Sequence, residues 1–166
     1  MTGAQWIESL NLVPHPEGGY YRETYRATER VEANGLPARF QASRSLSTAI
    51  YYLLERGDFS SFHRIKSDEI WHHYAGGDLC LHLLDPATGH VALRLGCNPD
   101  TGAQPQMVVP QGTWFAAEVS AESDYTLAGC TLAPGFEFAD LEMATAAVLS
   151  TEYPDAADLV RRLTRG

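Results

Sequence analysis

Hydrophobic and polar positions alternate along most of this chain, and a period of two is typical of β-strands. The alternation predicts short strands at close spacing, divided by turn signals such as Arg56-Gly57-Asp58 and Asn98-Pro99-Asp100. The expected strands are Ser45–Leu54, Ser60–Arg64, Glu69–Tyr74, Asp78–Leu84, Val91–Leu95, Gln106–Val109, Thr113–Val119 and Tyr125–Leu132. Many short strands at this spacing predict an all-β sandwich or closed barrel.

The two ends of the chain follow a helical period instead. Near the start, Thr2 and Gln5 have the spacing of a capping box ahead of an apolar helix face. Near the end, apolar positions from Leu141 to Val148 and from Ala157 to Leu163 predict two more short helices. We therefore expect one mainly β domain over residues 1–166, with short helices at both termini.

Charge and cysteine content narrow the classes of partner. The chain carries 12 basic and 21 acidic residues, a net charge of −9. A nucleic-acid backbone or an anionic membrane needs a basic face, so neither is an expected partner. No apolar run is long enough to span a bilayer, and the N-terminus does not resemble a secretory signal. Three cysteines without a CxxC pair favour a reducing, cytoplasmic location.

Three of the six histidines lie in one segment, FHRIKSDEIWHHYAGG. In the expected strand Glu69, Trp71 and His73 share one face, and His63 on the preceding strand meets Glu69 if the chain turns back. One carboxylate and two imidazoles, from Glu69, His63 and His73, are enough for a divalent metal with open positions. Without a metal, His63 and Glu69 form an acid–base pair.

This segment resembles the first signature motif of the cupin superfamily. Gly57, His63, Glu69 and Gly76 fall on its opening glycine, first histidine, carboxylate and closing glycine. The later stretch VPQGTWF resembles the second signature, in which a Pro-x-Gly turn opens a strand. The resemblance implies that His63 and Glu69 face a pocket.

Two of the four usual cupin metal ligands are replaced in this chain. Ile65 stands at the position of the second histidine and Phe115 at that of the third, and neither side chain binds a metal. A three-ligand site then requires His73 beside His63 and Glu69. The leading hypothesis therefore needs no cofactor, and a divalent metal remains the alternative.

Four blocks in order resemble the largely uncharacterised cupin-5 family: HPEGGYYRETYR, SDEIWHHYAGG, VVPQGTWFAAEV and GCTLAPGFEFADLEMA. The resemblance implies a cupin jelly-roll β-barrel, usually a homodimer, with a small-molecule pocket at its mouth. The family's fold is similar to that of the dTDP-4-dehydrorhamnose 3,5-epimerases, which work without a metal. We therefore expect a non-redox epimerase or isomerase that acts on a sugar or nucleotide-sugar. A metal-dependent oxygenase or isomerase and a non-catalytic binding or sensing module are the alternatives.

Basic residues of the first strand are candidates for holding a substrate. Arg22 and Arg26 share a strand face with Tyr20, and a guanidinium binds phosphate or carboxylate through paired N–H donors. Tyr20 or Tyr21 is a candidate donor to an enolate, and Arg44 is a weaker candidate for binding an anion. The structural alternative is an edge strand guarded by charge or exchanged across a dimer.

Aromatic residues supply the remaining candidates. Trp71 and Trp114 suit the flat face of a sugar ring if they point into the barrel, and they are core aromatics if they do not. His73 has the strand parity of Glu69, so it is the better pocket candidate of the two adjacent histidines.

Overall fold

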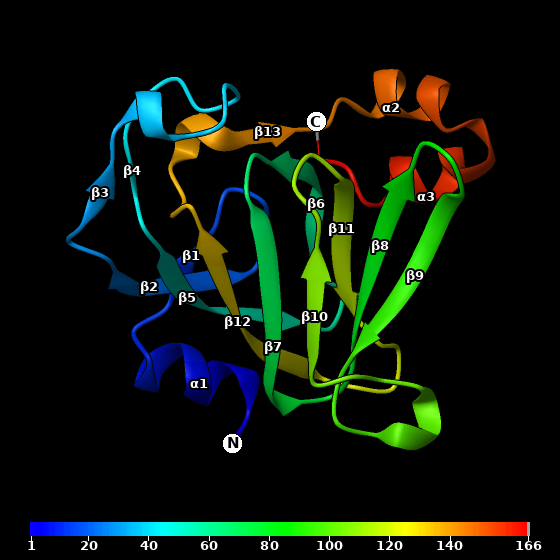
Figure 1. Cartoon of the computed structure of the whole chain (residues 1–166). Coiled ribbons are helices and arrows are strands. Elements are labelled where there is room, and N and C mark those ends of the chain that lie inside the picture. The colour runs from blue at the N-terminus through cyan, green and yellow to red at the C-terminus, as the bar shows by residue number, and fades with distance from the viewer. Residues whose placement is uncertain (166) are drawn as a thin grey trace.

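In the computed structural model, which describes residues 1–165, two antiparallel sheets pack face to face and short helices lie near both ends of the chain (Figure 1). The expected all-β class, with a jelly-roll arrangement and terminal helices, is confirmed. None of the helices in residues 1–165 is long and apolar enough to cross a membrane.

The larger sheet has six strands and the smaller has five, with a separate two-stranded ribbon beside them. In spatial order, the six are β1 (Val13–Pro14), β2 (Tyr20–Arg26), β5 (Thr48–Glu55), β12 (Tyr125–Ala133), β7 (Asp68–Gly76) and β10 (Gln106–Val109). The five are β13 (Leu141–Met143), β6 (Phe59–Ile65), β11 (Trp114–Val119), β8 (Leu79–Asp85) and β9 (Gly89–Leu95). The ribbon pairs β3 (Arg30–Val31) with β4 (Arg44–Ser45).

The main core fills the space between the two sheets. Alternate side chains of each strand point into it, as the period of two requires. Tyr52, Leu54 and Trp71 come from the larger sheet, and Leu81, Leu83 and Phe115 from the smaller one.

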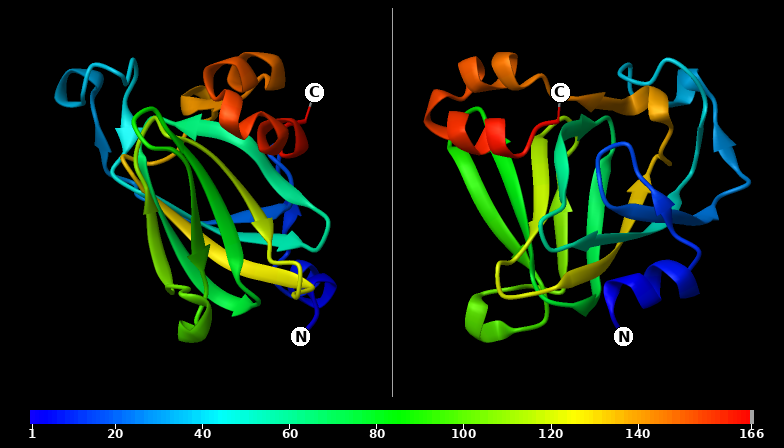
Figure 2. Two further views of the ribbon diagram at one scale, coloured as in Figure 1. Left: turned by 90° about the vertical axis from the view of Figure 1, so that its right-hand side faces the viewer. Right: turned by 180° about the vertical axis from the view of Figure 1, so that it is seen from behind.

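Helices cover other faces of the barrel. At the start, α1 (Gly3–Ser9) has the predicted capping box between Thr2 and Gln5, and it packs on the outer face of the larger sheet. At the end, α2 (Ala146–Glu152) and α3 (Ala157–Arg162) lie together against the outer face of the smaller sheet, far from α1 (Figure 2). Four single turns of 3-10 helix complete the list: η1 (Ala33–Gly35), η2 (Pro99–Thr101), η3 (Phe138–Asp140) and η4 (Pro154–Ala156).

The helix predicted from Leu141 begins later than expected. Residues Leu141–Met143 form β13, which pairs with the edge of β6, and α2 begins only after Thr145. The prediction was wrong at this point because an open sheet edge offers backbone hydrogen bonds that a spacing of apolar side chains does not reveal.

A β-bulge in β2 changes which arginine faces the barrel. The register between β2 and β5 shifts between Glu23 and Tyr25, so one extra residue is inserted there. Arg22 consequently stays on the outer face, whereas Arg26 joins Glu23 on the inner face. The prediction that Arg22 and Arg26 share a face was wrong for this reason.

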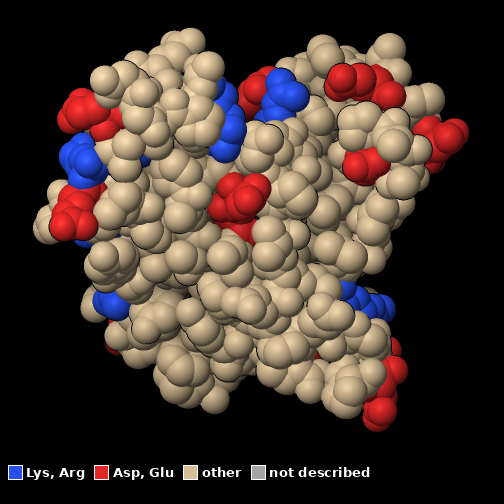
Figure 3. Space-filling view, in the orientation of Figure 1, with Lys and Arg blue, Asp and Glu red and all other residues tan. Residues whose placement is uncertain are grey.

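Charged residues are scattered over the molecule. In the face that Figure 3 shows, most charged side chains lie towards the edges, one acidic group lies near the centre, and there is no continuous basic patch.

Candidate functional site

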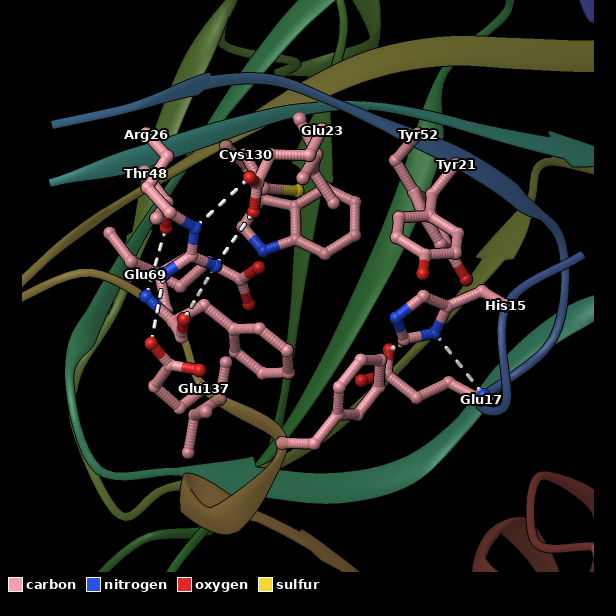
Figure 4. A pocket seen from close by; sticks show the side chains of 16 residues that line it. His15, Glu17, Tyr21, Glu23, Arg26, Thr48, Tyr52, Glu69, Cys130 and Glu137 are labelled. Carbon is pink, nitrogen blue, oxygen red and sulfur yellow. Dashed lines mark hydrogen bonds and ion pairs between the residues drawn. The ribbon is translucent and has the colours of Figure 1, made fainter. Parts of the chain in front are cut away.

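A cavity of about 280 Å³ lies between the two sheets, lined mainly from β2, β5, β7 and β12. Figure 4 shows His15 and Glu17 together on one side of it, and Arg26 with Glu23 and Glu137 on the other. The side chains of Arg26, Glu23 and Glu137 are about one-third exposed, whereas His15 and Glu17 are less than one-tenth exposed. The cavity therefore has a charged rim and a buried ionisable interior.

A tight turn brings Glu17 into this interior. Gly18 and Gly19 both have positive φ values, of 116° and 66°, which side-chain-bearing residues rarely adopt. A Cβ atom at Gly18 would collide with the Phe59 carbonyl oxygen, so the turn lies directly against β6. The amide of Ser61 donates to the Glu17 carbonyl at 2.8 Å, and this bond holds Glu17 against the same strand.

Glu17 lies between two imidazoles. Its Oε2 atom is 3.4 Å from Nε2 of His63 and 3.7 Å from Nδ1 of His15, and it accepts a hydrogen bond from Ser60 at 3.1 Å. His63 Nδ1 is 2.7 Å from the Ser61 carbonyl, so this nitrogen carries a proton, and His15 Nδ1 accepts from the Glu17 amide. In the neutral imidazoles both nitrogens that face Glu17 are acceptors. A proton shared between Glu17 and His63 is therefore the arrangement that satisfies this cluster.

Burial acts on each member of this cluster. It raises the pKa of Glu17 above its ordinary value, although His15 and Ser60 partly oppose the change. It lowers the pKa of His63, against an opposing effect of Glu69, and it lowers the pKa of His15. All three changes favour uncharged side chains, because the interior solvates charge poorly.

Glu69 is the second buried carboxyl of the cavity, at 6 % exposure on β7. Burial raises the pKa of Glu69 to about 7, while His63 lowers it and Glu17 raises it further. Within residues 1–165, no arginine or lysine forms an ion pair with Glu69. Glu69 is therefore divided between its acid and base forms near neutral pH.

Two more buried groups line the cavity beside these carboxyls. Tyr52 donates its hydroxyl hydrogen to the Gly18 carbonyl at 2.7 Å, and burial raises its pKa well above the ordinary value. Burial, reinforced by the negative charge of Glu69, likewise raises the pKa of the Cys130 thiol. Tyr52 and Cys130 therefore stay protonated at neutral pH, and the thiol is a poor nucleophile.

Five of the predicted candidates come together here, and two of them, Tyr21 and Arg26, line the cavity from β2. Glu69 and Trp71 line the cavity, and His63 lies directly behind Glu17, almost fully buried and 4.2 Å in ring separation from Phe115. His63 thus contacts the cluster of ionisable groups but does not line the cavity itself.

Five predicted residues lie elsewhere, and His73, the predicted pocket histidine, is one of them. Tyr20 packs with α1 on the outer face, where Arg22 lies over the ring of Tyr51 at 5.6 Å. Arg44 forms a buried ion pair with Asp140 and is not available to a substrate. Trp114 packs under the C-terminal helices, since its parity on β11 is opposite to that of the core residue Phe115.

The three-ligand metal site predicted from His63, Glu69 and His73 does not form. His73 and Glu69 are four residues apart on β7, roughly 13 Å along an extended strand, too far to share one metal ion. His73 lies instead beside Cys97, at 3.5 Å, and the Gly77 carbonyl, at 3.2 Å. No set of three or more His, Cys, Asp or Glu side chains in residues 1–165 is arranged to hold a metal, so the donors present do not fit one.

Much of the cavity wall could not be recognised from the sequence. His15 and Glu17 belong to the block HPEGGYYRETYR, which served only as a mark of the family. Tyr21, from the same block, was a candidate donor, and it does line the cavity. The signal available there was a double glycine directly after a histidine and a carboxylate. Tyr52 and Cys130 gave no signal, because each stands in an apolar strand pattern.

A family model described as the Cupin_5 cupin superfamily (DUF985) matches residues 4–144. A curated relative, the uncharacterised protein YML079W of Saccharomyces cerevisiae, is 30 % identical over 145 residues, which are 82 % of this chain and 72 % of the yeast protein.

Solved structures show the same fold. Protein SO0799 from Shewanella oneidensis is 33 % identical, with a TM-score of 0.88 over 99 % of this chain and 98 % of that one. A hypothetical protein from Leishmania major is 32 % identical, with a TM-score of 0.89 over the whole of both chains. Oxalate decarboxylase from Bacillus subtilis is 14 % identical, with a TM-score of 0.54 over 90 % of this chain and 36 % of the decarboxylase, a likeness of fold alone.

Proposed function

The chain belongs to the Cupin_5 family, and we propose that it binds a small polar metabolite in the barrel cavity and catalyses non-redox proton transfer on it. The observation that carries this proposal is Glu69, a carboxyl in the cavity wall whose pKa burial raises to about 7. A general acid or base works best when its pKa lies near the working pH. Glu69 is therefore the group that exchanges a proton with the ligand.

Glu17 in the cavity wall and His63 behind it act as positioning residues. The 3.4 Å contact between them places a shared proton next to the cavity, and the charge of Glu69 acts on the pKa of His63. A change in the protonation of Glu69 therefore changes the proton affinity of Glu17 and His63. Such coupling is suited to a reaction in which the ligand gives a proton to Glu69 and receives it back during one turnover.

Epimerisation or isomerisation of a sugar is the specific form of this proposal. Both reactions remove a proton from a carbon next to a carbonyl group and return it, without a change in oxidation state of the whole molecule. Aromatic side chains along the cavity, including Tyr21, Tyr52 and Phe136, suit the C–H face of a sugar ring.

Deuterium uptake tests the proposal without knowledge of the substrate. The purified protein is incubated in D₂O with a library of small metabolites, and mass spectrometry identifies compounds that gain carbon-bound deuterium. We expect the wild type to label a small set of related compounds and Glu69→Gln to label none of them. Equal labelling by both proteins would contradict the role of Glu69.

A ligand-binding module without catalysis is the second candidate. It is favoured by the complete enclosure of His63, which is 1 % exposed and does not line the cavity. In the same experiment this function predicts a metabolite that co-purifies with the protein, seen by native mass spectrometry, and that is released without any deuterium.

A further inference from the structure

Two polar atoms in the cavity wall have no hydrogen-bond partner within residues 1–165: Oε2 of Glu69 and Nε1 of Trp71. Glu69 is 6 % exposed and Trp71 is 2 % exposed. A buried polar group without a partner costs free energy and is rare in folded proteins. The other two such atoms, in Ser150 and Thr164, belong to the C-terminal region and not to the cavity lining.

The two atoms are neighbours in the wall. Glu69 and Trp71 are two residues apart on β7, so their side chains leave the same face of the strand, roughly 7 Å apart at Cα. Burial has the largest effect on the pKa of Glu69 and raises it, whereas the Trp71 N–H and the Cys130 thiol, which both point towards this carboxyl without completing a hydrogen bond to its Oε2 atom, lower it. One small ligand can therefore reach both atoms.

Their chemistry defines the ligand groups. An indole N–H donates and cannot accept, so Trp71 requires an acceptor oxygen. An ionised carboxylate accepts and cannot donate, so Glu69 requires a donor such as a hydroxyl. A hydroxyl and a carbonyl on adjacent carbons satisfy both atoms at once.

The charge of the cavity selects against anions. Four carboxyls line it, from Glu17, Glu23, Glu69 and Glu137, whereas Arg26 is the only arginine or lysine among the lining residues of the described chain. The Arg26 guanidinium already binds Glu23 at 2.8 Å and Glu137 at 2.9 Å. A phosphate or diphosphate would meet more negative than free positive charge, which argues against a nucleotide-sugar.

The volume of the cavity also selects a small ligand. The cavity volume of about 280 Å³ lies just below the range typical of ligand sites, which begins at about 300 Å³. A single sugar ring or an open chain of similar size suits this space better than a nucleotide.

We propose that the substrate is an uncharged α-hydroxycarbonyl sugar, and that the Trp71 indole N–H is a catalytic hydrogen-bond donor to its carbonyl oxygen. This inference rests on the proton-transfer function proposed above. The Glu69 carboxylate accepts from the hydroxyl and takes the proton of the carbon that bears it. The electron pair of that C–H bond forms the carbon–carbon double bond, and the carbonyl π pair moves to oxygen, where Trp71 stabilises the negative charge. Return of the proton gives an isomer or the starting sugar, so no oxidant or reductant is needed.

The kinetic test uses Trp71→Phe, which keeps an aromatic ring against Tyr52 and Phe115 but removes the N–H group. Uncharged aldoses and ketoses, their phosphate esters and deoxy analogues without the α-hydroxyl are incubated in D₂O, and exchange is followed by NMR. We expect exchange on the uncharged sugars only, with kcat about 10²–10³-fold lower in Trp71→Phe and KM changed far less. Trp114→Phe is the matched control, since that indole packs outside the cavity, and it should exchange like the wild type.

A binding measurement gives a second readout that does not depend on turnover. The chain has three tryptophans, so a spectrum of ¹⁵N-labelled protein should contain three indole N–H signals, and the signal that is absent in Trp71→Phe belongs to Trp71. Titration with an exchanging sugar should move the Trp71 signal downfield and leave those of Trp6 and Trp114 in place.

The outcomes separate this inference from the function on which it rests. Wild-type exchange that is lost in Glu69→Gln but unchanged in Trp71→Phe would overturn the role of Trp71 alone. Faster exchange on the phosphate esters would overturn the substrate class alone. No exchange by the wild type on any compound would overturn both the function and the inference.

Discussion

Two buried polar clusters of this barrel are built in opposite ways. In the first, which we call the Arg44 pair, the guanidinium of Arg44 binds both carboxylate oxygens of Asp140 at 2.6 Å and also donates to the carbonyls of Ala42 and Ser43 at 2.9 Å. In the second, the cavity cluster, Glu17 and Glu69 are buried with imidazoles, and no arginine or lysine in residues 1–165 forms an ion pair with their carboxyls.

The difference shows what each cluster does. Paired and hydrogen-bonded charges are stable where they are, and hydrogen bonds with Asp140 raise the pKa of Arg44. Buried carboxyls without a cation change their proton occupancy instead, as the pKa of about 7 for Glu69 illustrates. The fully paired charges of Arg44 and Asp140 stabilise the fold, whereas a buried carboxyl without a cation, such as Glu69, is able to exchange a proton.

The largest expected effect is on proton exchange in Glu69→Gln. This substitution keeps the shape of the side chain but removes its ability to take a proton, so we expect exchange to fall by about 10²–10⁴-fold, measured by NMR in D₂O. The melting temperature at neutral pH should stay equal or rise, because a neutral amide avoids the cost of burying a charge. Arg44→Met is the converse variant and should retain exchange wherever it remains folded. A large loss of exchange in Arg44→Met would remove the distinction between the clusters.

The next effect is on stability at the Arg44 pair. Arg44→Met leaves Asp140 buried with only Lys66 nearby, at 3.5 Å, so we expect the free energy of unfolding to fall by about 3–5 kcal/mol. Denaturant unfolding measures this change. The double variant Arg44→Met/Asp140→Leu should recover much of the loss, because an apolar pair of similar volume replaces both charges.

An exposed ion pair provides the control for that measurement. Arg56 and Asp124 are 3.0 Å apart and mostly exposed, so Arg56→Met should change stability little. Equal losses in Arg44→Met and Arg56→Met would show that burial of the pair is not what matters.

The third prediction concerns the pH dependence of stability at Glu69. Its pKa is raised from an ordinary value of 4.5 to about 7 on folding, so the folded state binds this proton more tightly than the unfolded state. The proton's contribution is fully present below pH 4.5 and is lost as pH rises through 7. Relative to Glu69→Gln, the wild type should therefore lose roughly 3 kcal/mol between these values. Chemical unfolding of both proteins across this pH range measures the difference in their free energies of unfolding. Because both proteins contain the same histidines, the contribution of histidine titration largely drops out of that difference.

The fold was predictable from the sequence further than the cavity was. Alternation and turn signals reflect local geometry, so the strand from Gln106 to Val109 and most of its neighbours were predicted with small errors at their ends. The β-bulge in β2 reversed the assignments of Arg22 and Arg26, because one inserted residue changes parity without any mark in the hydrophobic pattern.

The other site residues could not be predicted because their positions depend on contacts between segments far apart in the sequence. Arg44 and Asp140 are 96 residues apart, and their pairing follows from the approach of β4 to the segment before β13. Glu17 enters the cavity through a turn that packs on β6, which no spacing along the chain records. Glu69 and Trp71 were placed correctly because one strand carries both, so parity alone decides that they share a face.

The smallest expected effect lies on the outer face of the smaller sheet, at Glu118. There His82 Nε2 donates to Glu118 at 3.0 Å and Arg162 binds the same carboxylate at 2.5 and 2.9 Å, so histidine and glutamate meet again, but with a cation present. Hydrogen bonds from Arg162, followed by that from His82, lower the pKa of Glu118. Its contribution to stability is therefore present above the ordinary carboxyl pKa and is lost as pH falls through the lowered value.

Glu118→Gln should lower stability at neutral pH by about 1 kcal/mol or less, because this carboxylate is partly exposed to solvent. In thermal unfolding, the stabilities of the wild type and Glu118→Gln should become equal in acid, where wild-type Glu118 is protonated. The difference in stability between the wild type and Glu69→Gln should behave differently, since it disappears by pH 4.5 and widens towards pH 7. Proton exchange should be unchanged in Glu118→Gln, since a carboxylate already bound by a guanidinium has little tendency to take a proton. Loss of exchange in this variant, with exchange retained in Glu69→Gln, would move the acid–base chemistry from the cavity to the outer sheet.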